Sequence, residues 1–173
     1  NVGIINITGY AGAEIARLVY THPELKLVSA TGRSKAGQNL DQVFPHLEKT
    51  NIKIQEELSD NVDFVFSALP HAASAEKLSQ YVDSGIPAVD ISADFRLKDL
   101  STYEDWYEIT HPRPELVDKS TYGLPELHRE DIKKSKLVAN PGCFPTGGIL
   151  SMSPAVKNDL IEDMIIIDSK TGV

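Results

Sequence analysis

The chain has 173 residues, of which 41% are hydrophobic and 24% charged, as in an ordinary globular domain. Its formal net charge of -8 argues against a nucleic-acid surface, and no apolar run approaches the ~20 residues of a membrane span. One cysteine excludes an intrachain disulfide and fits a reducing compartment, so we expect a cytoplasmic protein that binds neither nucleic acid nor membrane. Apolar strands lie close to both termini, which predicts that both ends are cut.

The first segment has the order of a dinucleotide-binding unit. Residues 2–7 are a continuous apolar run, which predicts a strand buried on both faces. Residues 13–21 read as a helix with an inner face of Ile15, Leu18 and Val19. Between them lies a turn that can bind a pyrophosphate at the helix start, formed by Thr8, Gly9, Tyr10, Ala11 and Gly12. The full fingerprint has a glycine at position 6, where this chain has Asn6, and two glycines alone are common in such turns.

The second predicted strand, residues 25–31, bears on the choice of cofactor. An NAD site usually places Asp or Glu at its end, about 20 residues past the glycines, to hold the ribose 2′-hydroxyl. That place holds Thr31, and it is followed by the basic loop Arg33, Ser34 and Lys35. A 2′-phosphate would suit the two cations, so the sequence favours NADP. A solvated basic loop without a ligand is an equally good interpretation of this segment alone.

Further apolar strands at 62–69 and 86–91 alternate with a helix at 72–84, and residues 51–55 alternate like an edge strand. The pattern predicts an α/β, doubly wound parallel sheet of the Rossmann-like type, with ligands at the carboxyl ends of its strands. At the end of strand 62–69, Pro70 is a candidate cofactor contact. His71 is expected to be a turn residue beside the cofactor rather than a catalytic base.

Arg96 follows the strand at 86–91 and permits two interpretations. Its guanidinium can clamp a phosphate or carboxylate through two hydrogen bonds, or it can pair with Asp94 or another acid of the loop. Residues 97–135 then form a long and irregular insertion, which is usually functional in a compact domain. Its histidines, His111 and His128, lack metal-ligand spacing, so we expect no metal site.

The single thiol, Cys143, lies where a strand at 136–140 turns into a helix predicted to begin at Pro145. A helix N-terminus favours the nucleophilic thiolate, and its free N–H groups can receive an oxyanion. A buried, inert cysteine is the alternative, but turn-forming residues on both sides favour a presented catalytic nucleophile. Residues 164–168 predict a last strand whose partners lie outside the chain.

Several blocks together resemble the N-acetyl-gamma-glutamyl-phosphate reductase family: residues 8–12, 68–71, 89–97, 122–127, 138–146 and 168–173. Asn6 and Phe144 depart from its pattern, since a small residue and a tyrosine are frequent there. The family is about twice as long, which makes this chain resemble its amino-terminal half. The resemblance implies a dinucleotide-binding domain at 1–141, followed at 142–173 by the start of an incomplete α+β catalytic and dimerisation domain.

The resemblance also implies a reaction. Such enzymes of arginine biosynthesis use NADPH to reduce a small acyl phosphate, N-acetyl-glutamyl 5-phosphate, to its semialdehyde through a cysteine thioester. Here the nucleophile would be Cys143, with Arg96 and Asn140 holding the substrate phosphate or the reacting carbonyl. The family's acid/base histidine would come after residue 173, and the complete protein would be a homo-oligomer.

Three alternatives remain open from the sequence. The substrate can be carrier-linked aminoadipyl phosphate, as in related enzymes of lysine synthesis, or the aspartyl phosphate of the aspartate-semialdehyde dehydrogenases. In a different class, the chain can be a non-catalytic nucleotide-binding module. Cys143 separates that class from the enzymes, because a pure binding module has no reason to present a thiol at a helix start.

Overall fold

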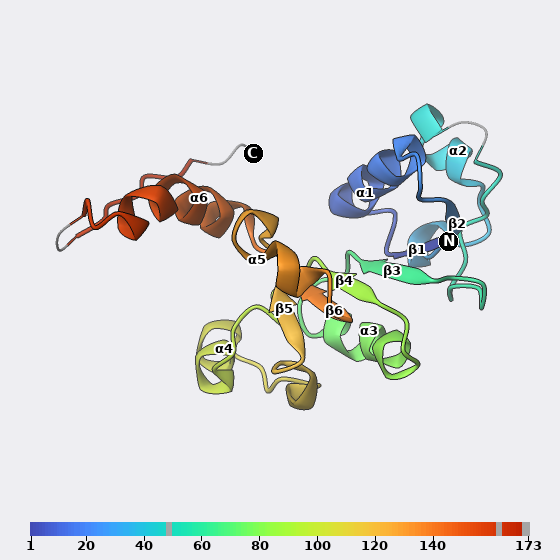
Figure 1. The fold of residues 1–173 in the computed structure, drawn as a ribbon. Coiled ribbons are helices and arrows are strands. Elements are labelled where there is room, and N and C mark those ends of the chain that lie inside the picture. The colour runs from blue at the N-terminus through green and yellow to red at the C-terminus, as the bar shows by residue number, and fades with distance from the viewer. Residues whose placement is uncertain (48–49, 162–163, 171–173) are drawn as a thin grey trace.

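The computed structural model describes residues 1–47, 50–161 and 164–170. Its centre is a six-stranded, all-parallel sheet in the order β2-β1-β3-β4-β6-β5 (Figure 1). The strands are β1 Val2–Ile5, β2 Leu27–Ala30, β3 Phe64–Ser67, β4 Ala88–Asp90, β5 Ser120–Tyr122 and β6 Leu137–Ala139. The strand order reverses between β1 and β3, and ligands bind at such a switch point, outside the carboxyl ends of the strands.

Helices cover both faces of the sheet, which confirms the predicted doubly wound fold. The α-helices are α1 Tyr10–Thr21, α2 Leu40–Val43, α3 Ala73–Asp83, α4 Leu100–Tyr107, α5 Pro125–Ile132 and α6 Cys143–Lys157, and the 3-10 helices are η1 Arg33–Lys35, η2 Pro45–Leu47 and η3 Pro114–Leu116. In β1, Ile4 belongs to the apolar core beneath α1 and α2, whereas Ile5 belongs to the core on the α3 side. Both faces of β1 are therefore buried, as its continuous apolar run predicted.

The inner face of α1 differs from the predicted one. Ala16 and Val19 are buried as part of the core, but Leu18 is 53% exposed. Neighbouring positions in an α-helix are about 100° apart, so a face centred on Ala16 and Val19 turns Leu18 to the side. A Cβ on Gly12 would lie 2.3 Å from the carbonyl oxygen of Asn6, so only glycine lets the helix start this close to the strand end.

Two predicted strands are wrong. Residues 51–55 make only isolated bridges, Thr31 with Gln55 and Asn39 with Lys53, although their alternation does bury Ile54. Residues 164–170 form no strand and are exposed. An apolar run becomes a strand only where a neighbour pairs with its backbone N–H and C=O groups, and the described residues place none beside it.

The insertion at 97–135 is more regular than predicted, because it contains α4, η3, β5 and α5. Asp99 caps α4 by accepting a hydrogen bond from the N–H of Ser101 at 2.9 Å. Proline stands in the first turn of both η3 and α5, where its missing N–H is not needed. β5 pairs with β6 and so becomes the edge of the sheet.

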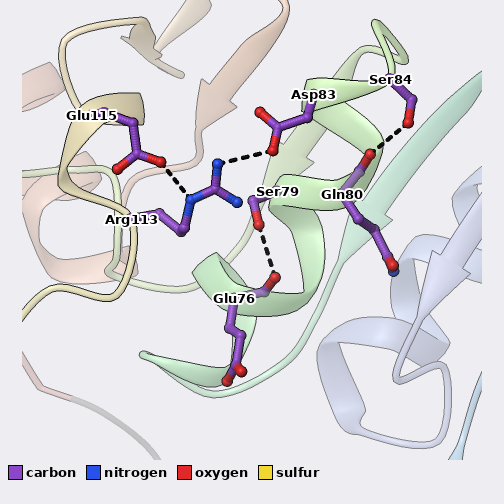
Figure 2. A network of polar contacts seen from close by, with 7 residues as sticks. All are labelled: Glu76, Ser79, Gln80, Asp83, Ser84, Arg113 and Glu115. Carbon is purple, nitrogen blue, oxygen red and sulfur yellow. Dashed lines mark hydrogen bonds and ion pairs between the residues drawn. The ribbon is translucent and has the colours of Figure 1, made fainter.

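Arg113 ties this insertion to the carboxyl-terminal end of α3 (Figure 2). Its Nη2 lies 2.9 Å from Oδ2 of Asp83, and its Nε lies 2.5 Å from Oε1 of Glu115. All three side chains are partly or largely open to solvent, so these ion pairs contribute little stability and serve chiefly to orient the loop.

Candidate active site

The glycine turn after β1 has the form of an anion-binding site. Gly9 is the N-cap of α1, and no side chain caps the first turn of the helix. Tyr10 and Ala11 are exposed, so the free N–H groups of the helix start can reach a ligand. The close fit at Gly12 fixes this turn against the end of β1. The five predicted residues therefore lie together at the carboxyl edge of the sheet.

Asn6, which stands where the full fingerprint has a glycine, fits the turn after β1 and supports it. Its φ of 61° is left-handed, a conformation that asparagine tolerates better than most residues. Its side-chain Nδ2 donates to the carbonyl oxygen of Ala68 at 2.8 Å, and its backbone N–H donates to Oγ1 of Thr31 at 3.2 Å. Asn6 thus joins the ends of β2, β1 and β3 across the switch point. The feature of the sequence that could have indicated this role is an asparagine directly after the strand β1.

The basic loop lies beside the glycine turn. η1 exposes Arg33, Ser34 and Lys35. A Cβ on the preceding Gly32 would lie 2.8 Å from Cγ2 of Thr8, which places the two loops in contact. Within the described parts of the chain, neither cation has an ion-pair partner. The arrangement of exposed cations beside free helix N–H groups suits an anionic ligand such as the phosphates of a dinucleotide.

Across the switch point, the turn after β3 exposes Pro70 and His71. The imidazole of His71 packs against the ring of Tyr107, with 5.2 Å between the ring centroids. The carbonyl of Ala68, at the start of this turn, is the acceptor for Asn6. Pro70 therefore lies among the loops around the switch point.

Arg96 is bound by main-chain carbonyls. Its Nε donates to the carbonyl oxygen of Asn140 at 2.7 Å, and its Nη2 donates to that of Ile91 at 2.7 Å. The interpretation that Arg96 pairs with Asp94 is wrong, because the Asp94 carboxylate accepts from other donors. A Cβ on Gly142 would lie 3.3 Å from Nη1, so the guanidinium lies directly beside the turn that precedes the thiol.

Cys143 is exposed and is the first residue of α6. The helix begins two residues before the predicted Pro145, which falls within its first turn, where proline is tolerated. Gly142 is the N-cap, and no side chain occupies the free N–H groups there. The Nδ2 of Asn140 donates to the carbonyl of Pro141 at 3.0 Å. Among the residues that the structure describes, no side chain hydrogen-bonds to the Cys143 thiol.

A buried polar cluster beneath these loops was not predicted. The carboxylate of Asp90 accepts from Oγ of Ser74 at 2.5 Å, from Oγ of Ser92 at 2.6 Å and from N of Ser92 at 2.9 Å. Burial raises the pKa of Asp90, against the opposing effect of these hydrogen bonds. The feature of the sequence that could have indicated this cluster is an acidic residue, Asp90, at the end of an apolar strand. The cluster joins β4 to the first turn of α3.

One face of α6 carries apolar side chains that line a groove. Between α6 and the tail that follows it runs a groove with a volume of about 800 Å³, lined mainly by Leu127, Phe144, Ile149, Met152, Ile165 and Ile167. Figure 1 shows α6 and this tail standing away from the sheet. The described residues contain no group of three potential metal ligands and no helix long and apolar enough to cross a membrane.

Comparison with known protein families identifies the family of this chain. Residues 1–135 match the family described as semialdehyde dehydrogenase, NAD binding domain. The chain belongs to this family. An N-acetyl-gamma-glutamyl-phosphate reductase of Dehalococcoides mccartyi is 52% identical over 171 residues, which are 99% of this chain and 50% of the relative. The corresponding protein of Methanocaldococcus jannaschii is 47% identical over 178 residues, 99% of this chain and 52% of its own length.

The chain thus spans about half the length of the curated relatives it matches. Among solved structures, aspartate semialdehyde dehydrogenase II of Vibrio cholerae superposes with a TM-score of 0.66 at 16% identity, over 91% of this chain and 46% of the other. The Candida albicans enzyme, solved with NADP, gives 0.62 at 18% identity over the same shares. At these identities the likeness concerns the fold, and it agrees with the observed sheet.

Proposed function

We propose that this semialdehyde dehydrogenase domain belongs to an N-acetyl-gamma-glutamyl-phosphate reductase, which reduces an acyl phosphate to an aldehyde with NADPH. In this proposal residues 1–141 form the dinucleotide-binding domain and residues 142–173 begin the catalytic domain. The observation that carries it is the exposed Cys143 at the start of α6, on the sheet edge that also holds the glycine turn. The 52% identity to reductases of that name supports the substrate class.

NADP is the proposed cofactor. The free N–H groups at the start of α1 would hold its pyrophosphate, and Gly12 permits the close approach of helix and strand that the site requires. Arg33 and Lys35 would bind the 2′-phosphate, with Ser34 between them, and Pro70 would border the cofactor from the end of β3. When bound, the reduced nicotinamide would supply the hydride for the acyl carbon.

The chain's own residues supply the nucleophile and its surroundings. The sulfur of Cys143 attacks the acyl carbon, a C–S bond forms, the C–O bond to phosphate breaks, and inorganic phosphate leaves. The N–H groups at the start of α6 would stabilise the oxyanion that develops on the carbonyl. After reduction the C–S bond breaks, which frees the aldehyde and the thiol. The proton-transferring group is proposed to lie outside these residues, because no side chain in the described part of the chain hydrogen-bonds to the thiol.

Arg96 and Asn140 are the proposed substrate contacts. Two N–H groups of Arg96, on Nε and Nη2, already bind main-chain carbonyls, and the N–H groups of Nη1, beside Gly142, are the proposed donors to a substrate phosphate. The amide of Asn140 lies at the same turn. A homo-oligomer of the complete protein is also proposed, on the resemblance alone.

The test is phosphate-dependent oxidation of the semialdehyde, the reverse reaction, measured in the full-length enzyme with N-acetylglutamate semialdehyde and aspartate semialdehyde compared side by side. We expect turnover with the acetylated substrate and none after Cys143→Ala. Turnover restricted to aspartate semialdehyde would mean that the enzyme is an aspartate-semialdehyde dehydrogenase instead. NADP binding without turnover of either substrate would favour the non-catalytic module.

A further inference from the structure

The turn between β3 and α3 is strained. Ala72, the N-cap of α3, has φ 63° and ψ -53°, which no L-residue adopts readily. The N–H of Ala73 donates to the carbonyl oxygen of His71 at 2.8 Å, so His71, Ala72 and Ala73 form a γ-turn with positive φ. This type of turn is rare and strained, and such strain persists only where the surroundings hold it.

Asp94 is the group that holds this turn. Its Oδ1 accepts a hydrogen bond from the N–H of Ala72 at 2.7 Å, and its Oδ2 accepts one from the N–H of Ala75 at 2.8 Å. Asp94 is fully buried, and its carboxylate thus caps α3 in place of the N-cap residue, which is an alanine without a polar side chain. A carboxylate at a helix N-terminus also interacts favourably with the helix dipole.

The insertion keeps Asp94 in place. The buried hydroxyl of Tyr103, on α4, donates to Oδ1 of Asp94 at 2.8 Å. Burial and the Asp94 carboxylate raise the pKa of Tyr103, so its phenol remains a donor. His111 lies 2.7 Å from the Asp94 carbonyl through Nε2, and Tyr107 packs on His71 itself. The turn is therefore held by hydrogen bonds to Asp94 and by the packing of Tyr107, from α4, against His71.

We propose that Asp94, supported by Tyr103, is a positioning residue that fixes the strained Pro70–Ala72 turn at the switch point and thereby shapes the cofactor site. The turn is joined to the glycine loop through Asn6 and the Ala68 carbonyl, so its placement reaches the proposed pyrophosphate site directly. Asp94 touches neither cofactor nor substrate in this assignment. The effect on cofactor binding rests on the proposed function, whereas the effect on the turn does not.

The test is Asp94→Asn in the full-length enzyme, with two readouts: hydrogen exchange at the N–H groups of Ala72 and Ala75, and the Kd for NADPH. An amide side chain cannot accept from both N–H groups and from Tyr103 in the same arrangement. We expect exchange at both positions to accelerate about tenfold or more, and the Kd to rise by a similar factor. Asp83→Asn, which weakens the tie at the other end of α3 (Figure 2), is the matched control and should change neither.

A rescue variant separates positioning from general stability. Glycine adopts positive φ without strain, so Ala72→Gly added to Asp94→Asn should recover part of the NADPH affinity. If Asp94→Asn does not fold, Tyr103→Phe with the same readouts replaces it, because it removes one donor from the same carboxylate. Unchanged exchange, an equal response in the Asp83 control, or no recovery by glycine would overturn the proposal. A wild-type enzyme that binds no NADPH would instead refute the proposed function, and the exchange measurement would still decide the role of Asp94.

Discussion

The guanidinium Nε of Arg96 donates to the main-chain carbonyl of Asn140 at 2.7 Å, which links the loop after β4 to the turn that presents Cys143. Through this bond and the one to Ile91, the side chain has a fixed orientation before any substrate arrives. A substrate phosphate would therefore meet a preorganised donor rather than a mobile cation. Arg96 thus holds the turn, and under the proposed function it would also contact the substrate.

Arg96→Lys is expected to lower kcat/KM by about tenfold or more, because the single nitrogen of an ammonium cannot reach two main-chain carbonyls and a substrate phosphate as the separate nitrogens of a planar guanidinium can. The measurement is steady-state kinetics in the full-length enzyme. Arg113→Lys is the control, since Arg113 also uses two guanidinium nitrogens, but it binds the carboxylates of Asp83 and Glu115 and not the loops of the candidate site. If both variants kept wild-type kinetics, Arg96 would be neither a substrate contact nor a support for the thiol.

Arg33→Ala should weaken NADP binding selectively, by about 1–3 kcal/mol, which is the scale of a lost charge-assisted hydrogen bond. The loss should be much smaller for NAD, because NAD lacks the 2′-phosphate. Titration of both cofactors into wild type and variant gives the comparison, and Arg129→Ala, an exposed cation on α5, is the control. Equal or tighter binding of NAD by the wild type would contradict the assignment of the basic loop.

The two glycines of the phosphate turn should respond differently to alanine. A Cβ at Gly12 would meet backbone atoms of Asn6 and Ile7 at 2.3 and 2.7 Å, whereas at Gly9 nothing lies closer than 3.5 Å. Gly12→Ala should therefore cost about 1–3 kcal/mol in the free energy of unfolding, the usual range for overpacking. Gly9→Ala should cost much less. Urea denaturation of both variants makes the comparison, and equal losses would mean that α1 can move away from β1.

The fold and the side-chain contacts in the structure differ in how far the sequence could predict them. Continuous apolar runs such as residues 2–7 identify buried parallel strands, and the carboxyl ends of those strands then gather the glycine turn, Arg96 and Cys143. The partners of Arg96 and Asp94 could not be predicted in this way. Arg96 and Asn140 are 44 residues apart, and no local pattern states which carbonyl a guanidinium will reach.

Asp90 should leave a signature in the pH dependence of stability. Burial raises its pKa in the folded state above the unfolded value of ~3.9, so the folded protein favours the protonated carboxyl. Its contribution to stability is therefore greatest below about pH 3.9 and declines as the pH rises toward the raised pKa. Relative to wild type, Asp90→Asn should be least stable at low pH and should recover as the pH rises.

Urea denaturation of both proteins between about pH 4 and 7 measures this difference. Asp105→Asn, at an exposed position on α4, serves as the control for the loss of a carboxylate outside the buried cluster. A destabilisation by Asp90→Asn that grew with rising pH would mean that the cluster with Ser74 and Ser92 holds a charged carboxylate.

Cys143 should be reactive in the 173-residue chain even where turnover is missing. The thiol is exposed at the start of α6, and the N–H groups that favour a thiolate belong to the described chain. We therefore expect iodoacetamide to alkylate Cys143 faster than a free cysteine at neutral pH. Because the chain has one cysteine, mass spectrometry reports this site alone.

The same chain should not oxidise NADPH with an acyl phosphate, because no described side chain hydrogen-bonds to the thiol to transfer its proton. The full-length enzyme, with N-acetylglutamyl phosphate and no NADPH, should instead accumulate a thioester on Cys143 that Cys143→Ala cannot form. Alkylation no faster than that of free cysteine would mean that the start of α6 does not activate the sulfur. Turnover by the 173 residues alone would place the acid/base group among them, and His71 and His128 would then be the first residues to substitute.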